Sequence, residues 1–407
     1  MSPKSMSPKS ISPKSHAGSL PVVKIARRGV DRLKNGHVWV YRSDVSSAEG
    51  IAPGALVSVT DERGKSLGAA LFSSSSQIAI RMISPEPVSD LPALLRERIH
   101  AAIAYRERVV RDSDAYRVVF SEADFLPGLI VDRYNDILTL QVLTQAMDGP
   151  PVRETILSEL NDGLKPASVI ERVDPKIREL EQLPSRSSAA IQGEKTATVF
   201  SMNAVKFHYD ALEGQKTGAF LDQRENYAAA AQYARGEALD AFCYQGGFAL
   251  HLAQQCSKVT GIDSSRPALE VADRNALLNG RDIEWIEANV FDLMRDYSSA
   301  KTRYDTIVLD PPAFAKSKQN LEAALRGYKE LNLRALKMLR PDGILVTCSC
   351  SYHVSQEAFA EMLGEAARDA RRTVRILESR GQAKDHPSLL NVPETAYLKC
   401  MILSIGS

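Results

Sequence analysis

The chain has 407 residues, a formal net charge of +1 and five cysteines. Its length suffices for two or three domains, and its hydrophobic share of 44% and charged share of 25% are typical of a globular protein. The balanced charge excludes a general polycation, so a nucleic-acid surface has to be a local patch. No apolar run approaches the about 20 residues of a membrane-spanning helix, and an odd number of cysteines does not favour a secreted disulfide framework. We therefore expect a cytoplasmic protein without membrane contact.

Residues 1–20 contain three near-copies of Ser-Pro-Lys, which begin at Ser2, Ser7 and Ser12. Proline and serine at this density, with almost nothing to bury, predict a disordered basic tail. The tail lacks the apolar core of a secretory signal.

Residues 21–88 are predicted to form a small β module. Asp-Glu-Arg-Gly at 61–64 predicts a hairpin turn between strands at 55–59 and 67–72, and another strand follows at 78–83. Basic residues precede the stretch Gly-His-Val-Trp-Val at 36–40, namely Arg27, Arg28, Arg32 and Lys34. They form either an RNA-backbone contact or an ordinary solvated face, and Trp39 is expected in the small core. The stretch at 36–40 and the strand spacing resemble a PUA domain, an RNA-binding unit.

Residues 89–203 are predicted to form a linker helix and a central α+β domain. Apolar residues at helical spacing predict the helix at 91–110. The strands and the second helix of this block are predicted at 116–120, 129–134, 137–142, about 152–161 (helix), 168–172 and 197–201. The block contains no catalytic constellation, so we interpret it as a spacer between the two ends.

Residues 204–407 open with a strand, a glycine loop and a helix, in the stretch 238–254. This is the first unit of a nucleotide-binding α/β sheet, and its glycines let the backbone approach a ligand closely. A second strand ends at Asp263, about twenty residues after the loop, where such folds place a carboxylate on ribose hydroxyls. Because the loop is not G-x-G-x-x-G, it argues against a dinucleotide and favours an adenosyl cofactor.

Three more strands alternate with helices in this domain. One is predicted, with its following loop, in the stretch 284–292, one begins at 304 and ends in Asp310-Pro311-Pro312, and one is predicted at 344–350. Alternating strands and helices predict a doubly wound, parallel, Rossmann-like sheet, with ligands at the carboxyl ends of its strands.

Motifs along most of the chain are similar to one family. They are Gly-Gln-Lys-Thr-Gly at 214–218, Phe-Leu-Asp-Gln-Arg at 220–224, Asp-x-Phe-Cys-Tyr-x-Gly-Gly-Phe at 240–248, Asp-Pro-Pro-Ala-Phe at 310–314, Ser-Cys-Ser at 349–351, Asp-His-Pro at 385–387, Pro-Glu-Thr at 393–395 and Tyr-Leu-Lys at 397–399. In these the chain resembles the PUA-containing, S-adenosylmethionine-dependent methyltransferases that make 5-methylcytosine in large-subunit rRNA, the RlmI type. The resemblance implies a class I methyltransferase domain at 204–407.

The resemblance also implies which residues bind the cofactor and the RNA. The loop at 240–246 would wrap the methionine portion, Asp263 would hold the ribose, and Asn289 stands where the family usually has an aspartate facing the adenine amino group. An amide oxygen accepts that bond as well. Lys216 and Arg224 would lie near either the cofactor carboxylate or the RNA phosphate. The cofactor set is Asp240, Phe242, Tyr244, Gly246, Asp263, Ser264, Asn289, Val290, Asp310 and Arg224, and the substrate set is Lys216, Pro311, Pro312 and Phe314.

Cys350 and Asp310 are the expected catalytic residues. Cytosine C5 is a poor nucleophile toward a methyl sulfonium, but addition of a thiolate at C6 turns C5 into an enamine carbon that attacks. In the resemblance, the cysteine of Ser-Cys-Ser matches this nucleophile. Asp310 is placed to hydrogen-bond the N3/N4 edge of cytosine. Cys348, two residues back on the same strand, is expected to be a core residue.

Two further features bear on the chemistry: the residues after Asp310-Pro311 and the pair Asp385-His386. Many RNA 5-methylcytosine enzymes have a second cysteine after the proline of the Asp-Pro-Pro loop, which assists product release. Here that place holds Pro312 and Ala313, so a different base must remove the C5 proton, and the sequence does not name it. The pair Asp385-His386 is either a general acid/base or a structural, hydrogen-bonding pair, and the structural role is expected.

The predicted activity is therefore transfer of a methyl group to cytosine C5 in large-subunit rRNA. One alternative is methylation of a purine nitrogen, which needs no thiolate, and another is an inactive RNA-binding factor of ribosome assembly. The intact Asp240, Asp263 and Asp310 argue against the inactive factor. Cys348-x-Cys350-x-x-His353 has a passing likeness to metal-ligand spacing, but without a second ligand cluster no metal is expected. A homodimer is left open.

Overall fold

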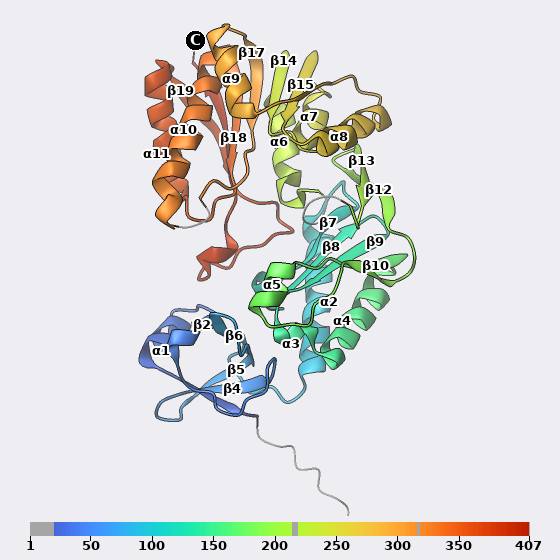
Figure 1. Cartoon of the computed structure of the whole chain (residues 1–407), viewed down its shortest axis with the longest axis vertical. Helices are drawn as coiled ribbons and strands as arrows, with labels where there is room; N and C mark the ends of the chain where they lie inside the picture. The colour runs from blue at the N-terminus through green and yellow to red at the C-terminus, as the bar shows by residue number, and fades with distance from the viewer. Residues whose placement is uncertain (1–19, 214–218, 316–317, 407) are drawn as a thin grey trace, which may run out of the picture.

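The computed structural model describes residues 20–213, 219–315 and 318–406. They form three successive parts, which follow the colours of Figure 1 from blue to red. The predicted tail at 1–20 lies outside the described residues, apart from Leu20. Among the described residues, no helix has both the length and the apolar composition needed to cross a membrane.

The N-terminal part is a six-stranded sheet in the order β2-β6-β5-β4-β1-β3. Its elements are β1 (Val22–Ile25), α1 (Arg27–Lys34), β2 (Trp39–Tyr41), η1 (Arg42–Asp44), β3 (Val45–Ser47), β4 (Leu56–Asp61), β5 (Ser66–Phe72) and β6 (Ile78–Ser84). The predicted hairpin at 61–64 is confirmed, since Asp61 Oδ1 accepts hydrogen bonds from the N–H groups of Arg63 (2.9 Å) and Lys65 (2.8 Å).

Trp39 does not belong to the small core of this sheet, contrary to expectation. The neighbouring Val40 is fully buried, whereas Trp39 is only partly buried. The indole N–H of Trp39 donates a hydrogen bond to Glu122 Oε1 of the central part at 2.9 Å. A partly apolar ring with a polar N–H is well suited to such a junction, because its donor needs a partner.

The central part packs two long helices on a five-stranded sheet in the order β11-β10-β9-β8-β7. The helix predicted at 91–110 is confirmed as α2, and Asp90 caps it by accepting a hydrogen bond from the Ala93 N–H. The elements are α2 (Leu91–Val109), β7 (Ala115–Phe120), η2 (Ser121–Asp124), β8 (Leu129–Tyr134), β9 (Ile137–Val142), α3 (Gln145–Asp148), α4 (Pro150–Leu164), β10 (Ser168–Glu171), α5 (Pro175–Leu180) and β11 (Ala189–Gln192), followed by the hairpin β12 (Ala197–Met202) and β13 (Val205–Asp210).

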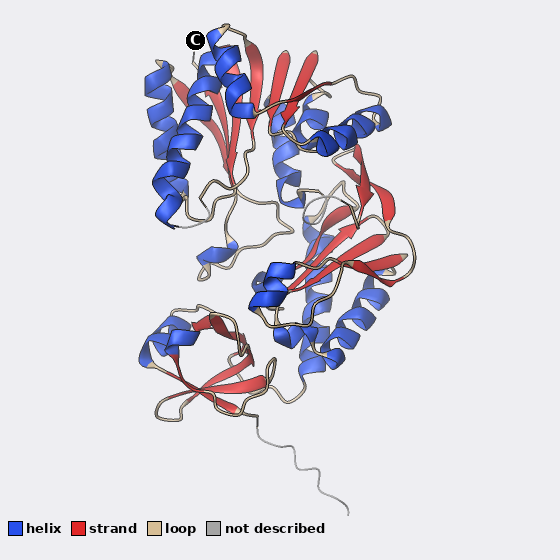
Figure 2. Cartoon of the chain, viewed as in Figure 1, coloured by secondary structure: helices blue, strands red, loops and turns tan. Residues whose placement is uncertain are grey.

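The C-terminal part is a seven-stranded sheet in the order β16-β15-β14-β17-β18-β20-β19. The first five strands are parallel, and β20 and β19 continue the sheet antiparallel. Figure 2 shows helices on both faces of this sheet, so the predicted doubly wound, Rossmann-like fold is confirmed. Its elements are η3 (Leu221–Gln223), α6 (Arg224–Tyr233), β14 (Glu237–Ala241), α7 (Gly247–Leu252), β15 (Lys258–Asp263), α8 (Arg266–Leu278), β16 (Glu284–Glu287), α9 (Val290–Ser299), β17 (Tyr304–Leu309), η4 (Lys318–Asn320), α10 (Leu321–Met338), β18 (Leu339–Ser349), α11 (Gln356–Ala370), β19 (Val374–Arg380), η5 (Pro393–Thr395) and β20 (Lys399–Ile405).

A long excursion between β19 and β20, at 381–398, joins the three parts (Figure 1). Its Asp385 carbonyl accepts a hydrogen bond from Arg106 of α2 at 2.7 Å, and its Asp385 carboxylate accepts one from the Arg117 N–H of β7 at 2.8 Å. Farther along, Glu394 Oε2 lies 3.2 Å from His37 Nε2 of the N-terminal part. The excursion thus joins the C-terminal part to both other parts through polar side chains.

Candidate active site

A cavity of about 530 Å³ lies at the carboxyl ends of β14, β15, β17 and β18. Parallel strands end at the same edge of a sheet, so the loops that follow them converge there. The lining residues come from these loops, from the segment before α6 and from the residues before β20; they are Met202, Phe207, Ala219, Phe220, Asp222, Gln223, Tyr227, Phe242, Cys243, Tyr244, Gln245, Gly247, Phe248, Asp263, Ser264, Ser265, Asp310, Pro311, Pro312, Ala313, Cys350, Tyr397 and Leu398.

The glycine loop after β14 has an unusual backbone. Phe242, Tyr244 and Gly246 have φ angles of +67°, +49° and +86°. Non-glycine residues rarely adopt such angles, and they concentrate at ligand-binding sites. A Cβ added to Gly247 would lie 2.5 Å from the hydroxyl oxygen of Tyr227. Glycine at 247 therefore lets the cavity-lining Tyr227 pack directly against the loop, and a side chain at this position would displace it.

Asp263 is held in a fixed orientation at the end of β15. Its Oδ2 accepts a hydrogen bond from the Tyr244 N–H and its Oδ1 accepts one from the Ser265 N–H, both at 2.9 Å. The side chain is half-buried and lines the cavity beside Ser264. We propose that Asp263 and Ser264 bind the ribose hydroxyls, since this is the position of the ribose carboxylate in doubly wound sheets.

Asp240 lies beneath the loop rather than on the cavity wall. It is fully buried, and its Oδ2 accepts a hydrogen bond from the Ala249 N–H in the first turn of α7 at 2.8 Å. Burial, together with the negative charges of Asp310 and Asp263, raises the pKa of Asp240 to about 8. Asp240 thus supports the loop from below, and its contact with the methionine portion of a cofactor remains a prediction.

The structure does not bring Arg224 to the cavity, contrary to its predicted place near the cofactor carboxylate or the RNA phosphate. Its side chain is 2% exposed and donates a hydrogen bond to Asp385 Oδ1 at 2.7 Å. A buried guanidinium needs such a partner, because an unpaired buried charge is costly. Arg224 and Asp385 therefore form a structural ion pair, in keeping with the structural role expected for Asp385.

Four other predicted residues do not line the cavity. Asn289 is exposed and caps α9, because its Oδ1, the atom that would accept from adenine, accepts hydrogen bonds from the N–H groups at 291 and 292. Val290 is buried in the core, and Phe314 packs against other aromatic rings. Gly246 acts through its backbone conformation. Lys216 lies outside the described residues.

Asp310 and Cys350 line the same cavity as Asp263. They follow directly on the ends of the neighbouring strands β17 and β18, which pair at Leu309 and Thr347. Cys350 is partly exposed, whereas Cys348 is fully buried, and burial raises the pKa of the Cys348 thiol well above its usual range. Of these two cysteines, only Cys350 has the exposure that a reactive thiol needs.

Three residues of this region were not identified as functional from the sequence. The Tyr397 hydroxyl donates a hydrogen bond to Asp222 Oδ2 at 2.6 Å, and both side chains line the cavity. Lys399 Nζ donates to the backbone carbonyls of Ser351 and Tyr397, both at 2.7 Å. Burial lowers the pKa of Lys399 to about 8, while the charge of Cys350 opposes this shift. All three residues belong to motifs that the sequence analysis had identified, at 220–224 and 397–399. The sequence did not show that Asp222 and Tyr397 form a hydrogen bond with each other.

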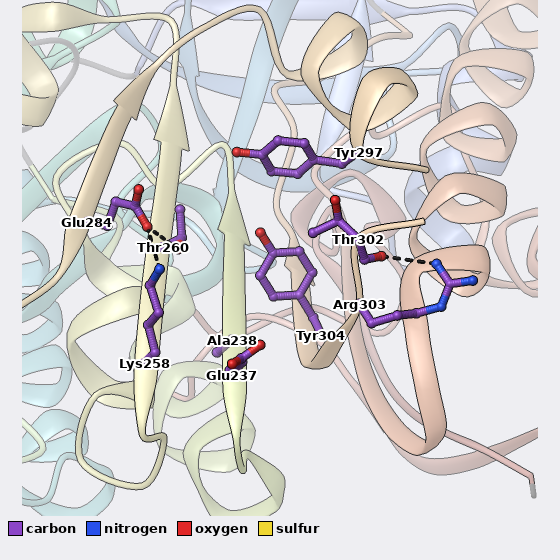
Figure 3. A pocket seen from close by; sticks show the side chains of 9 residues that line it. All are labelled: Glu237, Ala238, Lys258, Thr260, Glu284, Tyr297, Thr302, Arg303 and Tyr304. Atoms are coloured by element: carbon purple, nitrogen blue, oxygen red, sulfur yellow. Dashed lines mark hydrogen bonds and ion pairs between the residues drawn. The ribbon is translucent and has the colours of Figure 1, made fainter. Parts of the chain in front are cut away.

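A second, smaller hollow of about 300 Å³ lies at the opposite edge of the sheet (Figure 3). It is lined by the first residues of four strands, among others: Glu237, Ala238, Lys258, Thr260, Glu284, Tyr297, Thr302, Arg303 and Tyr304. No residue predicted from the sequence to bind cofactor or RNA lies there. Ligands of doubly wound sheets bind at the carboxyl ends of the strands, so we assign the chemistry to the larger cavity. Across the described ranges, no group of His, Cys, Asp and Glu is arranged to hold a metal ion.

Comparison with known proteins extends over nearly the whole chain. A PUA-like domain family matches residues 23–85, and an S-adenosylmethionine-dependent methyltransferase family matches residues 179–404. The chain is 38% identical over 384 residues to ribosomal RNA large subunit methyltransferase I of Tolumonas auensis, covering 91% of this chain and 96% of the relative. It is 36% identical over 399 residues to the Vibrio cholerae protein of that name, covering 94% and 100%.

Solved structures show the same fold. The crystal structure of SMU.776 in complex with SAH superimposes with a TM-score of 0.80 at 17% identity, covering 94% of this chain and 99% of that one. A SAM-dependent methyltransferase from Agrobacterium tumefaciens gives 0.51 at 18% identity, covering 73% and 91%. The cofactor is S-adenosylmethionine, and the cavity fits it: residues of the glycine loop line its wall, and Asp263 presents a fixed carboxylate there.

Replacing Asp263 with alanine should weaken the binding of S-adenosylhomocysteine by about 10- to 100-fold. Hydrogen bonds to a charged group contribute about 1.5–3 kcal/mol, and each 1.4 kcal/mol corresponds to a factor of ten. Isothermal titration calorimetry measures the loss directly. Glu270→Ala is the matched control, because the Glu270 side chain is exposed on α8 and pairs with Arg266 away from the cavity wall. Equal affinities for the wild type and Asp263→Ala would contradict the assignment.

Proposed function

Since this chain belongs to the ribosomal RNA large subunit methyltransferase I family, and is thus an S-adenosylmethionine-dependent rRNA methyltransferase, we propose that it methylates C5 of a cytosine through a covalent adduct on Cys350. The observation that carries this proposal is the shared cavity of Cys350, Asp310 and Asp263. The wall of this cavity contains the thiol of Cys350, the carboxylate of Asp310 after β17, and Asp263, which we propose binds the ribose of the cofactor.

Cys350 has the position and the chemistry of a nucleophile. Its thiolate would add to C6 of cytosine, which makes C5 an enamine carbon; C5 would then form the bond to the methyl group. Bound S-adenosylmethionine supplies this methyl group from its sulfonium. Loss of the C5 proton then restores the C5–C6 double bond and expels the Cys350 thiolate. The ammonium of Lys399, fixed at the carbonyl of Ser351, supports the thiolate form.

Asp310 and the two prolines after it are proposed to receive the base. Asp310 lies beside Cys350 in the cavity, where its carboxyl group would hydrogen-bond the N3/N4 edge of cytosine as the thiolate adds. Pro311 is buried and Pro312 exposed. Because proline lacks an N–H and fixes φ, the two residues hold this loop open toward the base.

The N-terminal part is proposed to hold the rRNA backbone through α1. The side chains of Arg27 and Arg28 are 93% and 76% exposed and form only long ion pairs, with Asp31 at 3.7 Å and Asp44 at 3.9 Å. Arg32, in contrast, is held by Asp44 at 2.7 Å. Exposed guanidinium groups on one short helix suit phosphate contacts, which are independent of sequence.

The experiment that tests this function is transfer of a labelled methyl group from S-adenosylmethionine to total rRNA, followed by nucleoside analysis. We expect labelled 5-methylcytidine in the large-subunit rRNA. A methylated purine would retain the fold and the cofactor but overturn the covalent mechanism. No transfer, together with no cofactor binding by calorimetry, would indicate an RNA-binding assembly factor.

A further inference from the structure

We propose that Asp222 is the base that removes the C5 proton, and that Tyr397 is a positioning residue for its carboxylate. This inference rests on the proposed cytosine-C5 chemistry, which requires a proton acceptor in the cavity. Asp222 lines that cavity together with Cys350 and Asp310. No second cysteine follows the Asp-Pro-Pro loop, so the acceptor has to come from another element.

Asp222 is firmly placed by contacts from both sides. It lies in η3, and its backbone carbonyl accepts a hydrogen bond from the Ala383 N–H of the excursion at 2.8 Å. Its carboxylate accepts the hydrogen bond from Tyr397 through Oδ2. A carboxylate has a second oxygen, and one fixed oxygen orients the other toward its target.

Among the described residues of the cavity wall, the other proton-accepting groups are less suited. Both oxygens of Asp263 accept hydrogen bonds from backbone N–H groups. Asp310 is already assigned to the N3/N4 edge of the base. Burial raises the pKa of both Tyr227 and Tyr397 well above the usual range, so these phenols stay protonated.

The remaining lining cysteine, Cys243, is excluded for a related reason. Burial raises the pKa of its thiol well above the usual range. Among the lining residues that the structure describes, Asp222 is the one carboxylate assigned neither to the ribose nor to the base edge. It is also only half-buried, so a proton taken from the substrate can pass on to solvent.

The polar and charged groups around Asp222 come from three elements. Tyr397 precedes β20, and Arg117 of β7 lies within electrostatic range of both Asp222 and Tyr397. Arg117 is itself paired with Asp132 of β8, with Nε and Oδ1 2.8 Å apart. On α6, Tyr227 feels the charges of both Asp222 and Asp310. Arg117 thus lies near Asp222 while its own side chain is held by Asp132.

The step balances as follows. After methyl transfer, C5 carries the new methyl group and one hydrogen, and C6 is bonded to the Cys350 sulfur. Asp222 takes the C5 hydrogen as a proton, and the C5–H electron pair forms the C5–C6 double bond. The C6–S bond breaks, and its electron pair leaves with Cys350 as a thiolate.

The test uses Asp222→Asn, which keeps the size of the side chain and an oxygen that accepts from Tyr397. Methyl transfer should still occur once, while release is blocked. We expect about one labelled methyl group per enzyme in a protein–RNA adduct that survives denaturing electrophoresis, and a turnover at least about 100-fold lower than in the wild type, as for removal of a general base. Tyr397→Phe retains the carboxylate, so it should slow turnover by a smaller factor.

Two controls separate this inference from the function on which it rests. Asp222→Asn combined with Cys350→Ala should give no adduct; methylated RNA from Cys350→Ala would overturn the covalent mechanism itself. If Cys350→Ala is inactive but Asp222→Asn turns over normally, only the role of Asp222 fails. That role also fails if Asp222→Asn loses S-adenosylhomocysteine binding, or if it binds the cofactor but forms no adduct.

Discussion

Replacement of Cys350 with alanine should abolish the formation of 5-methylcytidine in large-subunit rRNA. Without the sulfur, C5 of cytosine cannot become the enamine carbon that attacks the methyl group. We expect the rate to fall by about a thousand-fold or more, which corresponds to about 4 kcal/mol of barrier. The measurement is labelled methyl transfer with nucleoside analysis, in parallel with calorimetric titration of S-adenosylhomocysteine, whose binding should persist.

Cys348→Ala is the matched control for this variant. Cys348 lies two residues earlier on β18, is fully buried and pairs across the sheet with Cys400. Its removal takes one sulfur from the core, so it should lower stability slightly but keep methyl transfer within a few-fold of the wild type. Full activity of Cys350→Ala, or equal losses in both variants, would contradict the nucleophile assignment.

Of the variants proposed here, Arg224→Met should lower the free energy of unfolding most. It leaves the Asp385 carboxylate, which is 0% exposed, without its guanidinium partner. Breaking a buried ion pair from one side typically costs about 3–5 kcal/mol. Denaturant unfolding followed by circular dichroism measures this change. The control is Lys258→Met, which breaks the pair of Lys258 and Glu284, whose side chains are 62% and 50% exposed; its effect should stay below about 1 kcal/mol.

The same ion pair predicts a pH dependence. Burial alone would raise the pKa of Asp385, but the charges of His386 and Arg224 and the hydrogen bond from Arg117 N–H lower it well below the usual range. A depressed carboxyl pKa stabilises the fold above the unfolded-state value of about 4, and this contribution is lost as the pH falls below it. Wild-type stability should therefore decrease below about pH 4, and Arg224→Met should show a shallower decrease. Identical acid limbs would contradict the assignment.

Sequence patterns within short stretches were sufficient to predict many helices, strands and turns of this protein. The spacing of apolar residues and glycines predicted the strands that end near Asp263, Asp310 and Cys350. Because parallel strands share one carboxyl edge, the sequence also predicted that these three residues meet. The cavity brings them together as expected. The helix at 91–110 and the turn at 61–64 follow from equally local signals.

Only the tertiary structure decided which polar groups became partners. Asp222 and Tyr397 are 175 residues apart, and Arg224 and Asp385 are 161 residues apart. No periodicity or turn signal acts over such distances, because these contacts form when the excursion at 381–398 packs against η3 and α6. An arginine beside a cofactor motif was therefore mistaken for a ligand contact, although it balances a buried carboxylate. The proposed nucleophile follows from the short motif Ser-Cys-Ser, whereas its proposed base depends on how the chain folds back on itself.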